Sequence, residues 1–365
     1  IRAEERLPTT GSYQVELREV RPSNDDDATL IAAEHSFAKG EQGRIDGSAD
    51  SLRDAVEHYE TGLTYLSALE GKRAELDVDV LNSLGMAWLD LGDPEKGVGR
   101  FEEALVLVQE RNDNGRISET KRNLGHALEW LGQSTKAKGL FQEALDQSRH
   151  LGNPLDEALA LDGLGTVCYS LGDLRESLEY FNEAMVLLDK LTYRRGRAQT
   201  LMNLAYSYGD LSEDYKALDC LNQALELWRQ VGNRRGEALT VRVLGTLYTK
   251  LDEKQLALSY LDQARQLFGP LGDKNAQATL FNSMGQLYYD LNEVETALEY
   301  HEEALGLGQE IGLSIVTEVA LFKIGRCQQS LGRNQEALES YRQALALSRS
   351  SGSQIMISAA LADMG

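Results

Sequence analysis

The apolar residues of this chain recur with helical spacing. In one stretch they fall three or four places apart, on one face of a helix, at Leu161, Leu164, Val167, Cys168 and Leu171. A turn signal follows in Leu171-Gly172-Asp173, and a second apolar stripe then runs through Leu178, Phe181, Ala184 and Met185. Glycine after a helix supplies a left-handed residue, and we expect Asp173 to cap the next helix, with Glu176 completing a capping box. The pattern predicts two helices joined by a tight turn.

This unit repeats every 40 residues. Glycine stands at 85, 125, 165, 245, 285, 325 and 365, with Ala205 in the one missing place. Alanine stands at 104, 144, 184, 224, 264, 304 and 344. Small side chains at fixed places let two antiparallel helices approach to about 8–10 Å. The space between units is filled at a third column, which holds Phe101, Phe141, Phe181, Leu221, Leu261, His301 and Tyr341. The chain is therefore predicted to be all-α, a stack of helical hairpins that touch only their neighbours.

One unit reads Leu244, Gly245, Tyr248, Ala257, Leu261 and Ala264, and this pattern resembles the tetratricopeptide repeat. The usual repeat has 34 residues, whereas this one has 40 and lacks the usual proline after its second helix. The longer form is similar to the arrays of kinesin light chains, of mitotic-spindle orientation adaptors, and of bacterial proteins with a caspase-like (CHAT) domain. The resemblance covers about residues 28–365 and implies a right-handed α-solenoid with a short extended N-terminal segment.

The ends of the chain depart from the repeat. Residues 11–20 alternate polar and apolar as a half-buried strand does, so we expect residues 1–27 to hold the end of a preceding β domain plus a linker. Residues 28–69 are predicted to form an irregular first hairpin, and residues 70–365 seven 40-residue repeats plus a truncated last helix. Strand and first helix together look most like bacterial CHAT-domain proteins, which implies a caspase-like peptidase domain beyond residue 365.

Charge and composition exclude some classes of partner. The net charge is −21, with 58 acidic residues against 37 basic ones, so nucleic acid and anionic membranes are not expected to bind. This acidity is explained either by solubility or by cationic partners. No apolar run is long enough to span a membrane, and a cytoplasmic location is expected. The apolar residues Ile355, Ile357 and Leu361 lack a partner helix, which leaves the oligomeric state open.

The sequence contains no motif for catalysis or for binding a metal or phosphate group. Cys168, Cys220 and Cys327 are widely spaced, and the five histidines never pair at i, i+4, so neither a metal site nor an HExxH motif is formed. Gly132 to Lys136 lacks the spacing of a phosphate-binding loop and follows a helix instead of a strand. We therefore expect no catalytic residues, no metal and no cofactor.

A binding site is expected on the first helices of the hairpins, which line the concave face of such a superhelix. The side chains that packing does not use mix aromatic, amide and cationic groups, which suits a peptide. We predict a groove formed by Asn82, Arg122, Asn123, His126, Trp130, Tyr169, Asn203, Tyr206, Arg242, Asn282, Tyr289 and Arg326. An asparagine ladder along a peptide backbone, used by related families, is met here only at Asn123 and Asn203. Taken singly, each of these residues is equally explained as a solvated surface side chain.

A second candidate surface is a basic edge. Arg194, Arg234 and Lys274 recur at the starts of successive first helices, backed by Arg195 and Arg235. Positive charge at a helix N-terminus opposes the helix dipole, so helix stability does not explain it. Either an acidic partner or an internal salt bridge to Glu237 accounts for the edge, and we favour the internal pairing.

The sequence supports three hypotheses for function. The first is a protein-interaction scaffold that binds a peptide or a protein domain in its concave groove. The second is a regulatory repeat module that controls a caspase-like peptidase domain on the same polypeptide. The third is a purely structural spacer, which predicts that changes in the groove alter no interaction.

Overall fold

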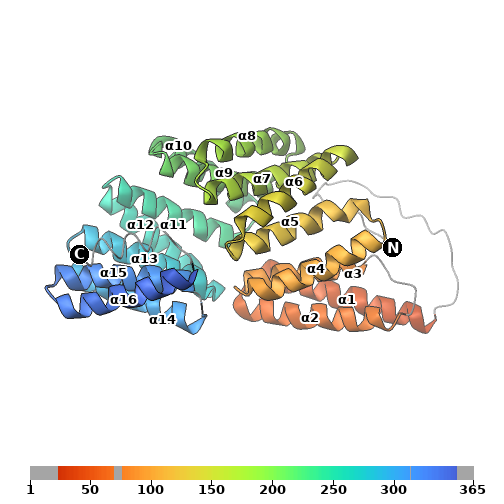
Figure 1. The fold of residues 1–365 in the computed structure, drawn as a ribbon, viewed down its shortest axis with the longest axis horizontal. Coiled ribbons are helices and arrows are strands. Elements are labelled where there is room, and N and C mark those ends of the chain that lie inside the picture. Colours follow the sequence, from red (N-terminus) through yellow and green to blue (C-terminus); the bar gives the residue numbers. More distant parts are fainter. Residues whose placement is uncertain (1–23, 70–75, 313, 352–365) are drawn as a thin grey trace.

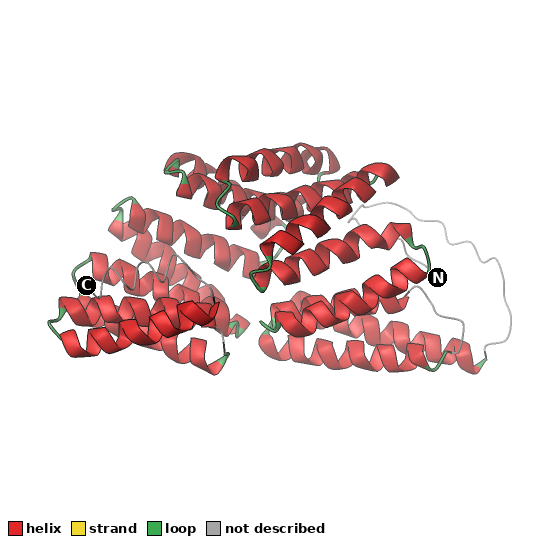
Figure 2. Cartoon of the chain, viewed as in Figure 1, coloured by secondary structure: helices red, strands yellow, loops and turns green. Residues whose placement is uncertain are grey.

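The computed structural model describes residues 24–69, 76–312 and 314–351. Within these ranges the chain forms α-helices and one short 3₁₀ helix, with no strand (Figure 2). The all-α solenoid predicted from the repeat is therefore confirmed. The strand predicted at residues 11–20 and the truncated last helix lie outside the described residues.

The helices pair in sequence order into eight hairpins over the described part of the chain. The first four are α1 (Asp25–Asp46) with α2 (Ala49–Ser67), α3 (Leu76–Asp90) with α4 (Pro94–Glu110), α5 (Asn114–Trp130) with α6 (Ser134–Leu151), and α7 (Pro154–Ser170) with α8 (Leu174–Leu191). The last four are α9 (Arg194–Asp210) with α10 (Asp214–Gln230), α11 (Arg234–Lys250) with α12 (Lys254–Phe268), α13 (Lys274–Asp290) with α14 (Val294–Glu310), and α15 (Ser314–Ser330) with α16 (Asn334–Ser351). The 3₁₀ helix η1 (Gly269–Leu271) follows α12.

The helix ends show which capping signals operate. Helix α1 begins at Asp25, not at residue 28, because the Asn24 side chain accepts from the Asp27 backbone and Asp27 accepts in return. The capping box predicted at Asp173 and Glu176 is wrong, since Asp173 makes no side-chain capping bond. Glu176 instead accepts from Lys138 of the preceding hairpin at 3.2 Å, and this pairing draws it away from the helix terminus.

The recurring small residues let large ones enter between helices. The Phe141 ring packs against Gly125 of its own hairpin and Gly163 of the next one. A Cβ atom at Gly163 would lie only 2.2 Å from that ring, so the close approach requires glycine. The alanines of the second column are almost fully buried, as at Ala104, Ala184 and Ala264.

The stack curves because its two helix layers pack differently. Each odd-numbered helix contacts the odd-numbered helix of the next hairpin, as α3 does α5 and α13 does α15. Even-numbered helices of neighbouring hairpins make no comparable contact in the described chain. The odd-numbered helices therefore lie on the inside of the bend, and Figure 1 shows the resulting arch, with α1–α4 and α13–α16 at its two ends.

The arch closes on itself at a contact that we call the seam. It joins the α1–α2 turn and the end of α3 to the starts of α11 and α13. Arg235 bonds Asp273 at 2.8 Å and lies 4.0 Å from Asp90, while a Cβ atom on Gly272 would lie 3.9 Å from that of Ala49. A partly open pocket of about 90 Å³ lies there. Burial raises the pKa of Asp90, although nearby arginines, Arg235 first, oppose that rise.

Candidate binding face on the inner helices

All twelve residues of the predicted groove lie on odd-numbered helices, from α3 to α15. The helices that carry them lie on the inside of the bend, and we call the surface of these helices the inner face. Their surroundings differ sharply along it. The α3–α9 part is bonded across neighbouring helices, whereas the α11–α15 part carries Arg242 and Arg326, which form no ion pair with any residue that the structure describes.

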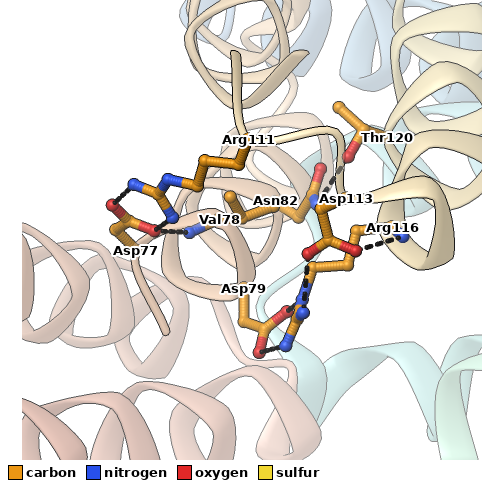
Figure 3. Close-up of polar contacts among 8 residues, drawn as sticks. All are labelled: Asp77, Val78, Asp79, Asn82, Arg111, Asp113, Arg116 and Thr120. Carbon is orange, nitrogen blue, oxygen red and sulfur yellow. Dashed lines mark hydrogen bonds and ion pairs between the residues drawn. The ribbon is translucent and has the colours of Figure 1, made fainter. Parts of the chain in front are cut away.

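Polar contacts tie α3 to the residue that ends α4, Arg111, and to α5 of the next hairpin (Figure 3). Arg111 donates to both oxygens of Asp77, one at 2.7 Å, and Arg116 binds Asp79 through two nitrogens at 2.7 and 3.1 Å. Such two-point pairs are the stronger form of ion pair. Beside them the Asn82 amide donates to the Thr120 hydroxyl at 3.0 Å. These groups hold the two hairpins together.

Asn82 and Arg122 are not free groove side chains. Both are buried, with 5% and 7% of their surface exposed. Arg122 donates to Asp156 of α7 at 2.9 Å, and Asn123 donates to Asn82 at 3.3 Å. Because their polar atoms face neighbouring helices, the prediction that they line an open groove is corrected here.

The same internal pairing continues at α7 and α9. Asp162 is buried and accepts from Thr200 at 2.7 Å and from Asn203 at 3.2 Å. Burial outweighs these two hydrogen bonds and raises the pKa of Asp162 to about 6. In α5 the His126 ring meets the Phe141 ring edge-on at 4.9 Å, and burial plus the Arg122 charge lowers the pKa of His126 to about 4.

Several aromatic side chains remain partly or largely accessible on this face. Trp130 at the end of α5 is 46% exposed. Tyr169 and Tyr206 lie on successive inner helices with ring centroids 6.4 Å apart. Burial, and then a hydrogen bond to Asp210, raise the pKa of Tyr169. Tyr289 shares a hydrogen bond of 2.8 Å with Ser330 of the following inner helix.

The α11–α15 part of the face is cationic. Arg242 has a buried Nε with no hydrogen-bond partner, and Arg326 lies over the Tyr289 ring at 5.0 Å. Lys323 donates to Gln286 at 2.5 Å. Between them Asn282 bonds the buried His301 at 3.0 Å. Burial, helped by the charges of Lys323 and Arg326, lowers the pKa of His301 to about 3, so its imidazole is neutral.

The three residues of the basic edge all lie at the starts of inner helices. Arg194, Arg234 and Lys274 are the first residues of α9, α11 and α13, and all three are exposed. Lys274 pairs with Glu310 at 2.5 Å. The internal pairing that we favoured is found at Lys274, but with Glu310 and not with Glu237, which accepts from Arg229 at 2.8 Å. Sequence reasoning placed Arg235 only behind this edge. It missed the bond to Asp273 of the next hairpin and the approach to Asp90, which forms only where the arch closes.

The described residues contain no group of three or more His, Cys, Asp or Glu side chains placed to hold a metal ion. Over the same residues, no helix combines the length and apolar character needed to cross a bilayer.

The fold is shared with several solved structures. A Rap protein complexed with competence and sporulation factor has a TM-score of 0.67 and 11% identity, covering 90% of this chain and 99% of the other. The Rap conjugation gene regulator of plasmid pLS20, in complex with the Phr* peptide, gives 0.66 and 17%, with 84% and 82% covered. The apo quorum sensor NprR from B. thuringiensis gives 0.63 and 17%, with 88% and 87% covered. At these identities the likeness establishes the fold.

Sequence comparison identifies the repeat. Tetratricopeptide repeat protein 29 of Trypanosoma brucei brucei (strain 927/4 GUTat10.1) is 30% identical over 141 residues, which is 36% of this chain and only 29% of that protein. Residues 50–137 match the family model of anaphase-promoting complex subunit 5. A tetratricopeptide repeat model matches residues 116–189, 196–268 and 276–350. These three segments make up more than half of the chain, which therefore belongs to the tetratricopeptide repeat family.

Proposed function

We propose that this protein is a scaffold that binds an extended peptide, or an extended segment of a partner protein, in a concave groove on its inner face. The observation that carries the proposal is the set of accessible aromatic rings on the inside of the bend. Tyr169 and Tyr206 form a pair on adjacent helices, and Trp130 leaves nearly half of its surface exposed. Rigid aromatic side chains supply contact area to a ligand at a low cost in entropy.

Structures of the same fold support the proposal. The Rap regulator of pLS20 was solved with the Phr* peptide, and NprR was solved with its cognate peptide NprX. This fold therefore accommodates peptides in other proteins.

The test begins with a library of random 12-residue peptides displayed on phage, selected on the purified protein. Hydrogen exchange with a selected peptide should protect odd-numbered helices and leave even-numbered ones unchanged. Tyr206→Ala combined with Tyr289→Ala should weaken binding about tenfold or more, because each ring loses its contact area. Tyr215→Ala is the matched control, since Tyr215 lies on α10 and is 84% exposed. Protection of even-numbered helices, or equal loss in the control, would refute the proposal.

A regulatory role toward a caspase-like peptidase on the same polypeptide is the alternative proposal. It is supported by the resemblance of residues 11–38 to bacterial CHAT-domain proteins, of which residues 11–23 lie outside the described structure. A polypeptide that carries both regions would change its peptidase rate when an inner-face peptide is added. An unchanged rate at saturating peptide would eliminate this alternative and leave the scaffold.

A further inference from the structure

Cations on this acidic protein usually have an acidic neighbour. Acidic residues outnumber basic ones by 58 to 37, so a carboxylate is seldom far away. The region around the second half of the inner face follows this rule. Ion pairs form there between Lys250 and Asp214 at 2.7 Å, Arg235 and Asp273 at 2.8 Å, and Lys274 and Glu310 at 2.5 Å. Two cations of the inner face, Arg242 and Arg326, lack such a partner within the described residues, and their surroundings set them apart from exposed cations such as Arg234.

Arg242, in the middle of α11, is one such cation. It makes no ion pair with any residue that the structure describes, and its buried Nε has no acceptor. Arg44 and Arg122 also have a buried Nε without an acceptor, but their guanidinium groups reach carboxylates at 3.4 and 2.9 Å. The Arg242 side chain is only partly buried, so it is the Nε–H alone that loses contact with water, and burying a donor without an acceptor costs free energy. An anion bound by the accessible part of the guanidinium would offset that cost.

Arg326 on α15 is the second cation. Its guanidinium lies over the Tyr289 ring, 5.0 Å from the centroid, and it too forms no ion pair within the described residues. Stacking on an aromatic ring fixes a guanidinium while leaving the N–H donors in its own plane. These donors match the two oxygens of a carboxylate. The Tyr289 ring is held in place by the hydrogen bond between its hydroxyl group and Ser330, so the surface on which Arg326 stacks is itself positioned.

The two arginines are spaced for an extended chain. Helices α11, α13 and α15 pack in succession, and Arg242 and Arg326 occupy the first and third of them. With about 8–10 Å between packed helices, the two groups are separated by about 20 Å. An extended peptide advances about 3.3 Å per residue, so this distance corresponds to about six residues.

We propose that the inner face of α11, α13 and α15 binds an acidic peptide segment, with one carboxylate on Arg242 and another, about six residues away, on Arg326. This inference rests on the proposed function and specifies the partner's chemistry. The carboxylates come from Asp or Glu side chains, or one of them is the C-terminal carboxylate. Since the whole protein carries a charge of −21, its overall field opposes such a ligand, and only the local arrangement favours it.

Peptide arrays test the sign of the preference. Random 12-residue peptides with equal aromatic content and net charges of −4, 0 and +4 are probed with the labelled protein. The overall charge of the protein predicts a preference for +4, whereas this proposal predicts a preference for −4. A preference for neutral or basic peptides would overturn the acidic partner and leave the scaffold standing. The absence of binding in all three classes would overturn both.

Variants then locate the interaction. Fluorescence anisotropy with an acidic array peptide should show about tenfold weaker binding for Arg242→Gln and for Arg326→Gln, because each loses a charge-assisted bond. Arg333→Gln and Arg342→Gln remove the same charge from exposed positions just before and within α16, an even-numbered helix, and should change affinity less than twofold. Equal losses in the controls would reduce the effect to overall charge and overturn the proposal.

Changes on the peptide make the result independent of protein folding. Replacing two Glu residues six places apart by Gln should weaken binding to the wild-type protein as much as the arginine variants do. Amidating the C-terminus distinguishes the two sources of carboxylate, since it lowers affinity only where the terminal group is used. If neither change lowers affinity, no carboxylate is recognised and the proposal fails.

Discussion

The two halves of the inner face are built from the same columns of the repeat but use them differently. Arg122 and Arg242 each stand three residues before the repeat glycine, at Gly125 and Gly245. Arg122 finds Asp156 on the next inner helix at 2.9 Å. The place equivalent to Asp156, thirty-four residues after the arginine, holds Ala276 in the second case. One side chain thus decides whether an inner-face arginine has an internal carboxylate partner.

This difference shows how a repeat protein can separate structure from recognition. In the first half, Asp156 and Asp162 satisfy polar groups of adjacent hairpins and join them. In the second half, apolar Ala276 continues the stack while leaving the guanidinium of Arg242 unpaired. Hairpins that stack through small and apolar residues need no polar bonds at these positions, so those positions become available to a partner.

The largest expected effect comes from making the first half resemble the second. Asp156→Ala would leave Arg122 as a buried unpaired charge, and we expect a loss of about 3 kcal/mol or more in the free energy of unfolding. Arg242→Ala should cost less than about 1 kcal/mol, because no internal partner is lost. Urea titration followed by circular dichroism measures both. Similar losses in the two variants would mean that the halves do not differ.

The sequence predicted the residue columns that repeat, but it did not predict the contacts that side chains make from one repeat to another. Glycine and alanine every 40 residues required helical hairpins, and the structure has them. Arg122 and Arg242 were indistinguishable as groove residues, because their burial depends on a residue of the next hairpin. The seam was equally hidden, since Asp90 and Arg235 approach only after the whole arch has curved. A contact between distant parts of the chain leaves no pattern in the local sequence.

The second-largest expected effect is on the pH dependence of stability and comes from His301. In the first half, the equivalent places hold Phe101, Phe141 and Phe181. Its pKa is lowered to about 3, so the folded state binds fewer protons than the unfolded state at acidic pH. Stability from this group is therefore complete above about pH 6.5 and declines toward pH 3. In the wild type, this group should lower the free energy of unfolding by about 2 kcal/mol between pH 8 and pH 5. His301→Phe should remove that loss.

Urea titrations at the two pH values give this difference directly. His150→Phe is the control, because His150 is exposed on α6 and lies far from the inner column. It should leave the pH dependence of the wild type unchanged. If the His301 variant also keeps the wild-type pH dependence, the neutral buried imidazole is not the cause of the acid-side decline.

A smaller effect is expected from converting the second half into the first. Ala276→Asp would supply Arg242 with the acidic partner that Arg122 already has, at the third position of α13, where the helix dipole favours an acid. We expect stability within about 1 kcal/mol of the wild type and affinity for acidic peptides reduced about tenfold. Ala276→Asn is the matched uncharged control and should reduce affinity less. Unchanged affinity in the aspartate variant would mean that Arg242 does not meet the ligand.

The smallest effect tests whether the two halves meet at the seam. Ala49→Cys with Gly272→Cys should form a disulfide on mild oxidation, because the two Cβ atoms would lie 3.9 Å apart, within the range of such bonds. Cys168, Cys220 and Cys327 are buried and should not compete. Ala49→Cys with Gly332→Cys is the control, since Gly332 has the same left-handed conformation and nothing near it. Arg235→Ala should slow the cross-link and cost less than about 1 kcal/mol, because its bond to Asp273 is partly exposed. If the pair at residues 49 and 272 cross-links no faster than the control pair, the arch is open at the seam. The acids Asp90 and Asp273 would then lie at a free edge of the inner face.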